Sequence, residues 1–235
     1  MSSLIRKATE DERKYYHQRL YPLQDQIFER LADFWKEGFY LTGGAALSRF
    51  YYEHRFSDDL DFFFDGKTYD NSRFKVLGAE LIDLISAEHD VEVSLEAEYF
   101  KRLFIRGEVD MKIEMVFDPY KRAGNLQDSY GICIDSKENI AANKFSAVSG
   151  RKMTKDFFDL FFLLREIGFN DAVGYAEYKH VPLDYEGIML AVGDLLSSPA
   201  ALEGQILTEI EVDETEFKAF VRDLIEKLII HAQSQ

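Results

Sequence analysis

A pair of glycines between an apolar run and a helical pattern constrains this chain more than any other stretch. Residues 39–41 are apolar and predict a buried strand, and Gly43 and Gly44 follow almost directly. Apolar residues then recur at helical spacing from Ala46, which predicts a helix over residues 45–53. A strand that turns through two glycines into a helix presents free backbone N–H groups and the positive end of a helix dipole. This arrangement suits a phosphate group.

Two aspartates lie where the chain leaves that helix and approaches a second strand. Asp59 and Asp61 precede three consecutive phenylalanines at residues 62–64, which predict a buried strand. Because alternate residues of a strand share a face, Ser57, Asp59 and Asp61 are expected to point the same way. Neighbouring carboxylates repel each other, and Mg²⁺ or Mn²⁺ is the usual partner of such oxygens. Metal and phosphate together predict a nucleoside triphosphate site; the alternative is a pair of solvated loop acids.

Composition limits the class of protein. The 235 residues are 46% hydrophobic and carry a formal net charge of −15, which disfavours non-specific adhesion to DNA or to an anionic membrane. Cys133 is the only cysteine, so an intramolecular disulfide and a cysteine metal cluster are excluded. The sequence contains neither a signal-peptide pattern nor an apolar run of about 20 residues. We therefore expect a cytoplasmic location and no membrane association.

The order of patterns predicts an α+β fold. A small mixed β-sheet core with flanking helices is expected over residues 1–135, followed by a C-terminal helical bundle over residues 136–235. The predicted strands, besides those above, span residues 91–97, 99–106, 109–117 and 130–134. The predicted helices span residues 9–36, broken near Pro22, and residues 71–87, 136–148, 154–167, 172–178, 185–196 and 214–232.

Further charged residues lie in patterned positions. Asp110 and Glu114 occupy the polar face of the strand predicted over residues 109–117. Lys144 lies at the edge of an apolar helix face, and Asp159 lies between two apolar residues and needs a partner, with Lys144 or Arg151 as candidates. A polyanionic partner would meet residues 144–155, where four basic residues occur without an acidic one: Lys144, Arg151, Lys152 and Lys155.

These residues together resemble the nucleotidyltransferase superfamily of the DNA polymerase β type. Within it, the chain is most similar to the AbiEii/AbiGii toxin family, and the resemblance spans residues 39–164. Its first block is Gly-Gly-x-Ala-Leu followed by Arg-x-Ser-x-Asp-Leu-Asp-Phe, represented here by Gly43, Gly44, Ala46, Leu47, Arg55, Ser57, Asp59, Leu60, Asp61 and Phe62. A second block is represented by Lys144, Arg151, Asp156, Asp159 and Leu160. One departure is position 45, where the family commonly has a small polar residue and this chain has alanine.

The resemblance implies roles for these residues. Asp59 and Asp61 would bridge two metal ions in an in-line transfer of a nucleoside monophosphate. The third carboxylate would be Glu114, with Asp110 as the alternative. Nucleotide binding would involve Gly43, Gly44, Ser57, Arg55 and Lys144, and Asp159 would orient Lys144. The alternatives are solvated acids at Asp110 and Glu114, a turn-forming serine at Ser57 and an exposed lysine at Lys144.

The resemblance also implies partners. A nucleoside triphosphate would be the donor substrate, and RNA, such as the 3′ end of a tRNA, would be the acceptor, bound through residues 144–155. The chain would then be a toxin countered by a separate antitoxin protein. Two alternatives stay open: transfer to a small molecule, and a nucleotide-binding module without catalysis.

Overall fold

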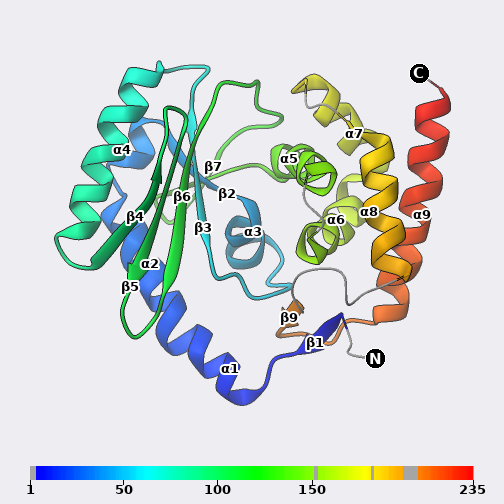
Figure 1. Ribbon diagram of the computed structural model, residues 1–235, viewed down its shortest axis with the longest axis horizontal. Helices are drawn as coiled ribbons and strands as arrows, with labels where there is room; N and C mark the ends of the chain where they lie inside the picture. The colour runs from blue at the N-terminus through cyan, green and yellow to red at the C-terminus, as the bar shows by residue number, and fades with distance from the viewer. Residues whose placement is uncertain (1–3, 151–152, 181–182, 198–205, 235) are drawn as a thin grey trace.

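The computed structural model describes residues 4–150, 153–180, 183–197 and 206–234. At its centre is a mixed seven-stranded sheet with strand order β4-β5-β6-β3-β2-β8-β7 (Figure 1). The strands are β2 (Phe39–Thr42), β3 (Leu60–Asp65), β4 (Asp90–Glu96), β5 (Phe100–Arg106), β6 (Met111–Asp118), β7 (Gln127–Ser129) and β8 (Ile132–Ile134). β3 pairs antiparallel with β2 and parallel with β6, and β8 pairs parallel with β2.

Helices cover both faces of the sheet. The elements before and beside it are α1 (Glu10–Tyr15), η1 (Tyr16–Leu20), α2 (Tyr21–Arg30), η2 (Phe34–Glu37), α3 (Gly43–Ala46), η3 (Leu47–Tyr51) and α4 (Asn71–Ser86). The later helices are α5 (Lys137–Gly150), α6 (Thr154–Ile167), α7 (Phe169–Tyr178), α8 (Tyr185–Ser197) and α9 (Glu214–Gln233). α2 and α4 lie on one side of the sheet, and α3 lies on the other, between the sheet and the later helices (Figure 1).

The aromatic run of β3 decides which face of the strand is buried. Phe62 and Phe64 are fully buried, and Phe64 packs against Phe74 of α4 with ring centroids 5.7 Å apart. Because side chains alternate along a strand, Asp61 points to the opposite face, toward α3. The phenylalanines thus anchor β3 on α4 and leave its acidic side chain facing the later helices.

The α+β fold class is confirmed, with several corrections to the expected elements. β3 begins only at Leu60, so Ser57 and Asp59 precede the strand and do not lie on its face. The helix is interrupted just before Pro22, as expected: the π-helical turn η1 ends at Leu20, and α2 begins at Tyr21 with Pro22 in its first turn, where a proline removes no hydrogen bond. α2 ends after Arg30, earlier than expected. Three short strands were not predicted: β7, and the pair β1 (Ile5–Lys7) and β9 (Ile206–Thr208), which are parallel to each other.

The division into residues 1–135 and 136–235 stays a prediction. Helices dominate after β8, but β9 returns to pair with β1 near the other end of the chain. Buried apolar residues of both segments, among them Phe62 and Phe158, also belong to one continuous cluster. Within the described ranges, no helix combines the length and apolarity that crossing a membrane requires.

Candidate active site

Strand pairing places the glycine turn beside Asp61. Thr42, the last residue of β2, is the register partner of Asp61, and Gly43 follows with φ of +68°. A Cβ atom on Gly43 would lie 2.5 Å from Asp61 Oδ2, far inside a normal contact. Only glycine therefore combines this backbone conformation with so close an approach of the carboxylate.

Gly44 makes room for the guanidinium group of Arg55. A Cβ atom on Gly44 would overlap Arg55 Nη2 and would lie 3.3 Å from Ser57 Oγ. Ser57 is itself buried, and its carbonyl oxygen accepts a hydrogen bond from Gln24 Nε2 at 3.1 Å. The structure thus brings Gly43, Gly44, Arg55, Ser57 and Asp61 together around one turn.

A group of three carboxylates forms on the same side of the sheet. The parallel pairing of β3 with β6 makes Glu114 the register partner of Asp61. Asp59 joins them from the segment before β3, since Lys112 Nζ lies 3.1 Å from Asp59 Oδ2 and 3.4 Å from Glu114 Oε1. Burial raises the pKa of Asp61 to about 6, and the negative charges of Glu114 and Asp59 add to the rise.

Basic side chains partly neutralise the group. Burial alone would raise the pKa of Glu114, but Lys112 and Arg102 lower it on balance, and Arg102 Nε donates to Glu114 Oε1 at 2.7 Å. Lys155, at the start of α6, lies 3.8 Å from Asp59 Oδ2. The later helices thus approach the carboxylates on the side of the sheet that α3 covers.

The donor chemistry of this group suits a hard divalent cation. Carboxylate oxygens are the ligands that Mg²⁺ and Mn²⁺ prefer, and burial, with the negative charges of Glu114 and Asp59, raises the pKa of Asp61. In the described part of the chain, no three acidic, histidine or cysteine side chains converge on one metal position. Lys112 places its ammonium group between Asp59 and Glu114 instead. A metal ion fits these residues only if the Lys112 amine moves aside.

Asp110, the alternative to Glu114, lies apart from the group. It precedes β6 in the turn after β5, and its side chain is exposed. Its carboxylate accepts hydrogen bonds from Arg106 Nη1 at 2.9 Å and from the backbone N–H of Gly107 at 3.3 Å. The turn residues that join β5 to β6 thus bind Asp110, whereas the strand register brings Glu114 to Asp61.

Lys144 is buried in ion pairs with two aspartates. Its amine lies 2.8 Å from Asp156 Oδ1 and 2.5 Å from Asp159 Oδ2, and all three side chains are almost fully buried. The expectation that residues 144–155 form a basic surface is therefore wrong at Lys144, because its amine is buried and paired with two aspartates. Arg151 and Lys152 lie outside the described residues.

Asp159 also binds Arg55, which joins α6 to the segment before β3. Arg55 donates from Nε to Oδ1 at 2.7 Å and from Nη2 to Oδ2 at 2.9 Å, a bidentate pair. His54 Nε2 lies 2.8 Å from the same Oδ1 and its ring stacks on Phe158. Burial alone would raise the pKa of Asp159, but Arg55 and Lys144 hold it well below its usual range.

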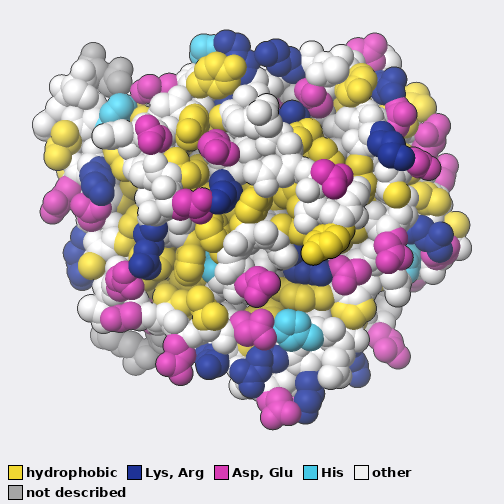
Figure 2. Space-filling model, turned by 180° about the vertical axis from the view of Figure 1, so that it is seen from behind, with side chains coloured by type: hydrophobic (Ala, Val, Ile, Leu, Met, Phe, Trp, Pro, Cys, Tyr) yellow, Lys and Arg dark blue, Asp and Glu magenta, His cyan; other side chains and the backbone are white. Residues whose placement is uncertain are grey.

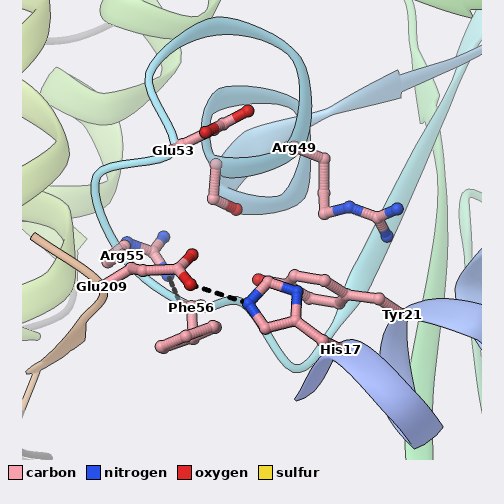
Figure 3. Close-up of a pocket in the computed structure, with 8 residues that line it drawn as sticks. His17, Tyr21, Arg49, Glu53, Arg55, Phe56 and Glu209 are labelled. Atoms are coloured by element: carbon pink, nitrogen blue, oxygen red, sulfur yellow. Dashed lines mark hydrogen bonds and ion pairs between the residues drawn. The ribbon is translucent and has the colours of Figure 1, made fainter. Parts of the chain in front are cut away.

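A pocket of about 300 Å³ lies beside Arg55 (Figure 3). Its lining combines the N-terminal helices, η3, the segment between η3 and β3, and the residue that follows β9. His17 Nε2 lies 2.9 Å from Glu209 Oε1 in this pocket. The lining residues are His17, Tyr21, Ser48, Arg49, Glu53, Arg55, Phe56 and Glu209. Arg55 therefore connects this pocket to the buried aspartates of α6.

Sequence reasoning missed Lys112, Arg102 and the part played by Asp156. Lys112 was not singled out, although its spacing from Glu114 places both on one face of the strand. Asp156 precedes Asp159 by one helical turn, a spacing that predicts a shared face and could have suggested a shared partner. Nothing in the sequence points to Arg102, because its contact depends on the β5–β6 register.

Solved structures of other proteins share this fold. JHP933 from Helicobacter pylori superposes with a TM-score of 0.59 at 20% identity, covering 92% of this chain and 95% of that one. MenT4, a nucleotidyltransferase toxin from Mycobacterium tuberculosis H37Rv, superposes with a TM-score of 0.50 at 16% identity, covering 89% of this chain and 82% of that one. Over most of its length, the chain thus shares its fold with these two proteins, of which MenT4 is a nucleotidyltransferase toxin.

The sequence itself shows to which protein family the chain belongs. The family model described as "Nucleotidyl transferase AbiEii toxin, Type IV TA system" matches residues 26–229, and the chain belongs to this family. An uncharacterized protein of Aquifex aeolicus (strain VF5), aq_aa25, is 34% identical over 134 residues. That match covers 56% of this chain and 60% of the length of the Aquifex protein.

Proposed function

We propose that this protein is a metal-dependent nucleotidyltransferase that transfers a nucleoside monophosphate from a triphosphate to an acceptor hydroxyl. The observation that carries the proposal is the placement of Asp61 between the glycine turn and Glu114 by strand register. Nucleotidyl transfer needs a polyphosphate and divalent cations in contact with each other. Backbone amides and carboxylates at one place supply both requirements.

Each residue then has a defined part. Asp59, Asp61 and Glu114 would hold Mg²⁺ or Mn²⁺, which when bound stabilises the charge on the attacking and leaving oxygens. The glycine turn would receive the triphosphate, with Ser57 as a donor. Arg55 and Asp159 fix the turn against α6 through their bidentate pair. The reaction is then promoted by positioning and by charge stabilisation.

Lys144 has a different setting from the one expected. Because two buried aspartates already bind its amine, we propose that it first of all holds α5 against α6. Contact between Lys144 and the triphosphate stays a prediction. A comparison of Lys144→Met with the wild type tests it, since loss of a phosphate contact raises the KM for the nucleotide, whereas loss of a helix contact lowers stability.

An RNA acceptor, such as a tRNA 3′ end, is proposed from the family alone. On the face of the molecule in Figure 2, basic side chains are interspersed among acidic ones, and the whole sequence carries a formal net charge of −15. Tight binding of RNA needs a concentration of basic charge. Transfer to a small molecule is therefore the second candidate, favoured by this charge distribution. A role as a toxin countered by a separate antitoxin is proposed with the RNA acceptor and is supported by the family description; a cytoplasmic location of this protein is proposed with it.

The test is transfer of label from α-³²P nucleoside triphosphates. The protein is incubated with each nucleotide, with Mg²⁺ or Mn²⁺, and with either total tRNA or a panel of small hydroxyl compounds. Labelled tRNA supports the RNA acceptor, and a labelled small molecule supports the second candidate. Glu114→Gln should abolish transfer, and Asp110→Asn is the matched control that should retain it. Nucleotide binding without transfer to any acceptor would contradict catalysis.

A further inference from the structure

Asp135 lies between the two segments that flank the glycine turn. It follows β8 directly and is fully buried. Its carboxylate accepts hydrogen bonds from Thr42 Oγ1 at 2.6 Å, from Asn139 Nδ2 at 2.8 Å and from the backbone N–H of Ser136 at 3.0 Å. Its carbonyl oxygen accepts a hydrogen bond from the Tyr51 hydroxyl at 2.7 Å. One buried residue therefore holds the chain just before the turn and again where η3 ends.

The bond to Asp135 changes what Thr42 does at the start of α3. Thr42 is the residue before the first helical position, where a threonine hydroxyl commonly accepts a hydrogen bond from a helix amide. Its backbone is extended, with φ of −136° and ψ of −170°, but its side chain makes no capping hydrogen bond. The hydroxyl donates to Asp135 instead. The first amides of the turn are thus left for another acceptor.

The setting of Asp135 is hard to explain by stability alone. Burial raises the pKa of Asp135 to about 6, and the hydrogen bonds from Thr42 and Asn139 act against that rise. A buried carboxylate held mainly by neutral donors is less favourable than a well-packed apolar residue. The side chain of Asn139 is itself held in place, because Lys179 Nζ from the end of α7 donates to its Oδ1 at 2.7 Å.

We propose that Asp135 is the positioning residue of the glycine turn: it draws the Thr42 hydroxyl away from the helix and keeps the turn amides open to the triphosphate. This inference rests on the proposed function in its choice of ligand. Asp135, the first residue after β8, would then influence nucleotide binding, although it does not touch the carboxylates that would hold metal.

The experiment compares four variants with the wild type. Thr42→Val removes the contact, and Asp135→Asn disrupts it by replacing one of the two accepting oxygens with an amide group. Thr42→Ser keeps the hydroxyl, and Asp118→Asn is the matched control. Asp118 is also a buried carboxylate; it shares Lys179 with Asn139, but it accepts from the Tyr40 hydroxyl at 3.0 Å and from Lys179 Nζ at 3.4 Å rather than from Thr42. The ligand is inorganic tripolyphosphate with Mg²⁺, followed by calorimetry, since it represents the part that all nucleoside triphosphates share.

We expect Thr42→Val and Asp135→Asn to weaken tripolyphosphate binding about tenfold, the effect of one or two hydrogen bonds. Thr42→Ser and Asp118→Asn should bind like the wild type. Equal binding by all variants, or equal weakening by Asp118→Asn, would overturn the inference.

A second measurement does not depend on any ligand. Hydrogen exchange of the amides of residues 43–51 should be faster in Thr42→Val and Asp135→Asn and unchanged in Asp118→Asn. If the wild type fails to bind tripolyphosphate, the proposed nucleotide site is wrong, and hydrogen exchange still decides whether Asp135 orders the turn. Unchanged exchange in Asp135→Asn would overturn the inference on its own.

Discussion

At the scale of single residues, acidic and basic side chains lie close together beside the glycine turn. Lys112 lies between Asp59 and Glu114, and burial, together with Glu114 and Asp59, raises the pKa of Asp61 to about 6. Burial would lower the pKa of Lys112, but its acidic neighbours raise it on balance. The amine therefore stays charged and acts as an internal cation of this group.

Replacement of Lys112 by methionine should strengthen the binding of divalent cations. The variant loses a positive charge that a metal must otherwise displace, so we expect the affinity for Mn²⁺ to rise about tenfold. Without metal, the variant should melt at a lower temperature than the wild type. Thermal melting with increasing Mn²⁺ measures both effects, and Lys75→Met, which removes an exposed ion pair with Glu98, is the control. An identical response of Lys112→Met and the wild type would contradict this role.

Asp159 should be a large contributor to stability. Replacing it by asparagine leaves Arg55 buried without its carboxylate and Lys144 with Asp156 alone, so we expect a loss of about 3–5 kcal/mol in the free energy of unfolding. Because the folded pKa of Asp159 is depressed, its contribution is present above the usual carboxyl pKa and is lost only as pH falls toward the folded value. Urea unfolding of wild type and variant from pH 7 to pH 3 measures this.

A matched exposed pair gives the reference for that experiment. Asp223 lies on α9, half exposed, 2.6 Å from Lys227 one turn later. Asp223→Asn should cost less than about 1 kcal/mol, as solvent-exposed pairs do. A comparable effect of Asp159→Asn and Asp223→Asn would show that the buried ion pairs contribute little.

At the scale of elements, periodicity predicted the helices and strands that are long or strongly amphipathic. β2, α6 and most later helices lie within a few residues of their expected bounds. β1 and β9 escaped prediction because each is three residues long and exists only through its partner about 200 residues away. The contact between Asp159 and Arg55 was not predicted for the same reason, since it depends on how α6 packs against the segment before β3.

The candidate site was predictable in its residue types and less so in its contacts. The glycine pair, Asp59 and Asp61 stand together in sequence, so local spacing was enough to single them out. Local spacing could not decide between Asp110 and Glu114, because only the register of β6 against β3 separates them in space. The burial of Lys144 was also hidden, since it follows from the approach of α5 to α6.

The two glycines of the turn provide an element-scale prediction. Gly43→Ala places a Cβ against Asp61 in a backbone conformation that alanine disfavours, and Gly44→Ala pushes against Arg55. Both variants should lose at least about 1 kcal/mol of stability, measured by urea unfolding, and most of any transfer activity. Gly174→Ala, in α7 with open space around its Cβ position, is the control and should gain about 0.5–1 kcal/mol. Normal activity in Gly43→Ala would contradict the close approach of Asp61.

At the scale of the whole molecule, the sheet and the later helices are held together by charge as well as by apolar packing. Arg55 and Asp159 join the segment before β3 to α6, and Lys155 of α6 approaches Asp59. Leu4 before β1 donates its backbone N–H to Glu214 of α9 at 3.0 Å. These contacts span the expected boundary between residues 1–135 and 136–235.

We therefore expect the two parts to unfold in one cooperative transition. Trp35, the only tryptophan, lies in η2 beside the sheet, whereas the later helices dominate the helical circular dichroism. Urea unfolding curves from tryptophan fluorescence and from circular dichroism at 222 nm, the usual helix wavelength, should coincide. Two separated midpoints would show that residues 1–135 and 136–235 fold as independent domains.

The pairing of β9 has a consequence for when this protein becomes complete during its synthesis. Phe56, next to Arg55, donates its backbone N–H to the carbonyl oxygen of Leu207 in β9 at 2.9 Å. The ribosome makes Leu207 about 150 residues after Phe56, which takes on the order of ten seconds at elongation rates of about 5–20 residues per second. Until Leu207 has been made, the segment that carries Arg55 and Phe56 lacks this support from β9. A newly made chain of this family therefore holds the glycine turn and its neighbouring segment for some time before the strand that braces them exists.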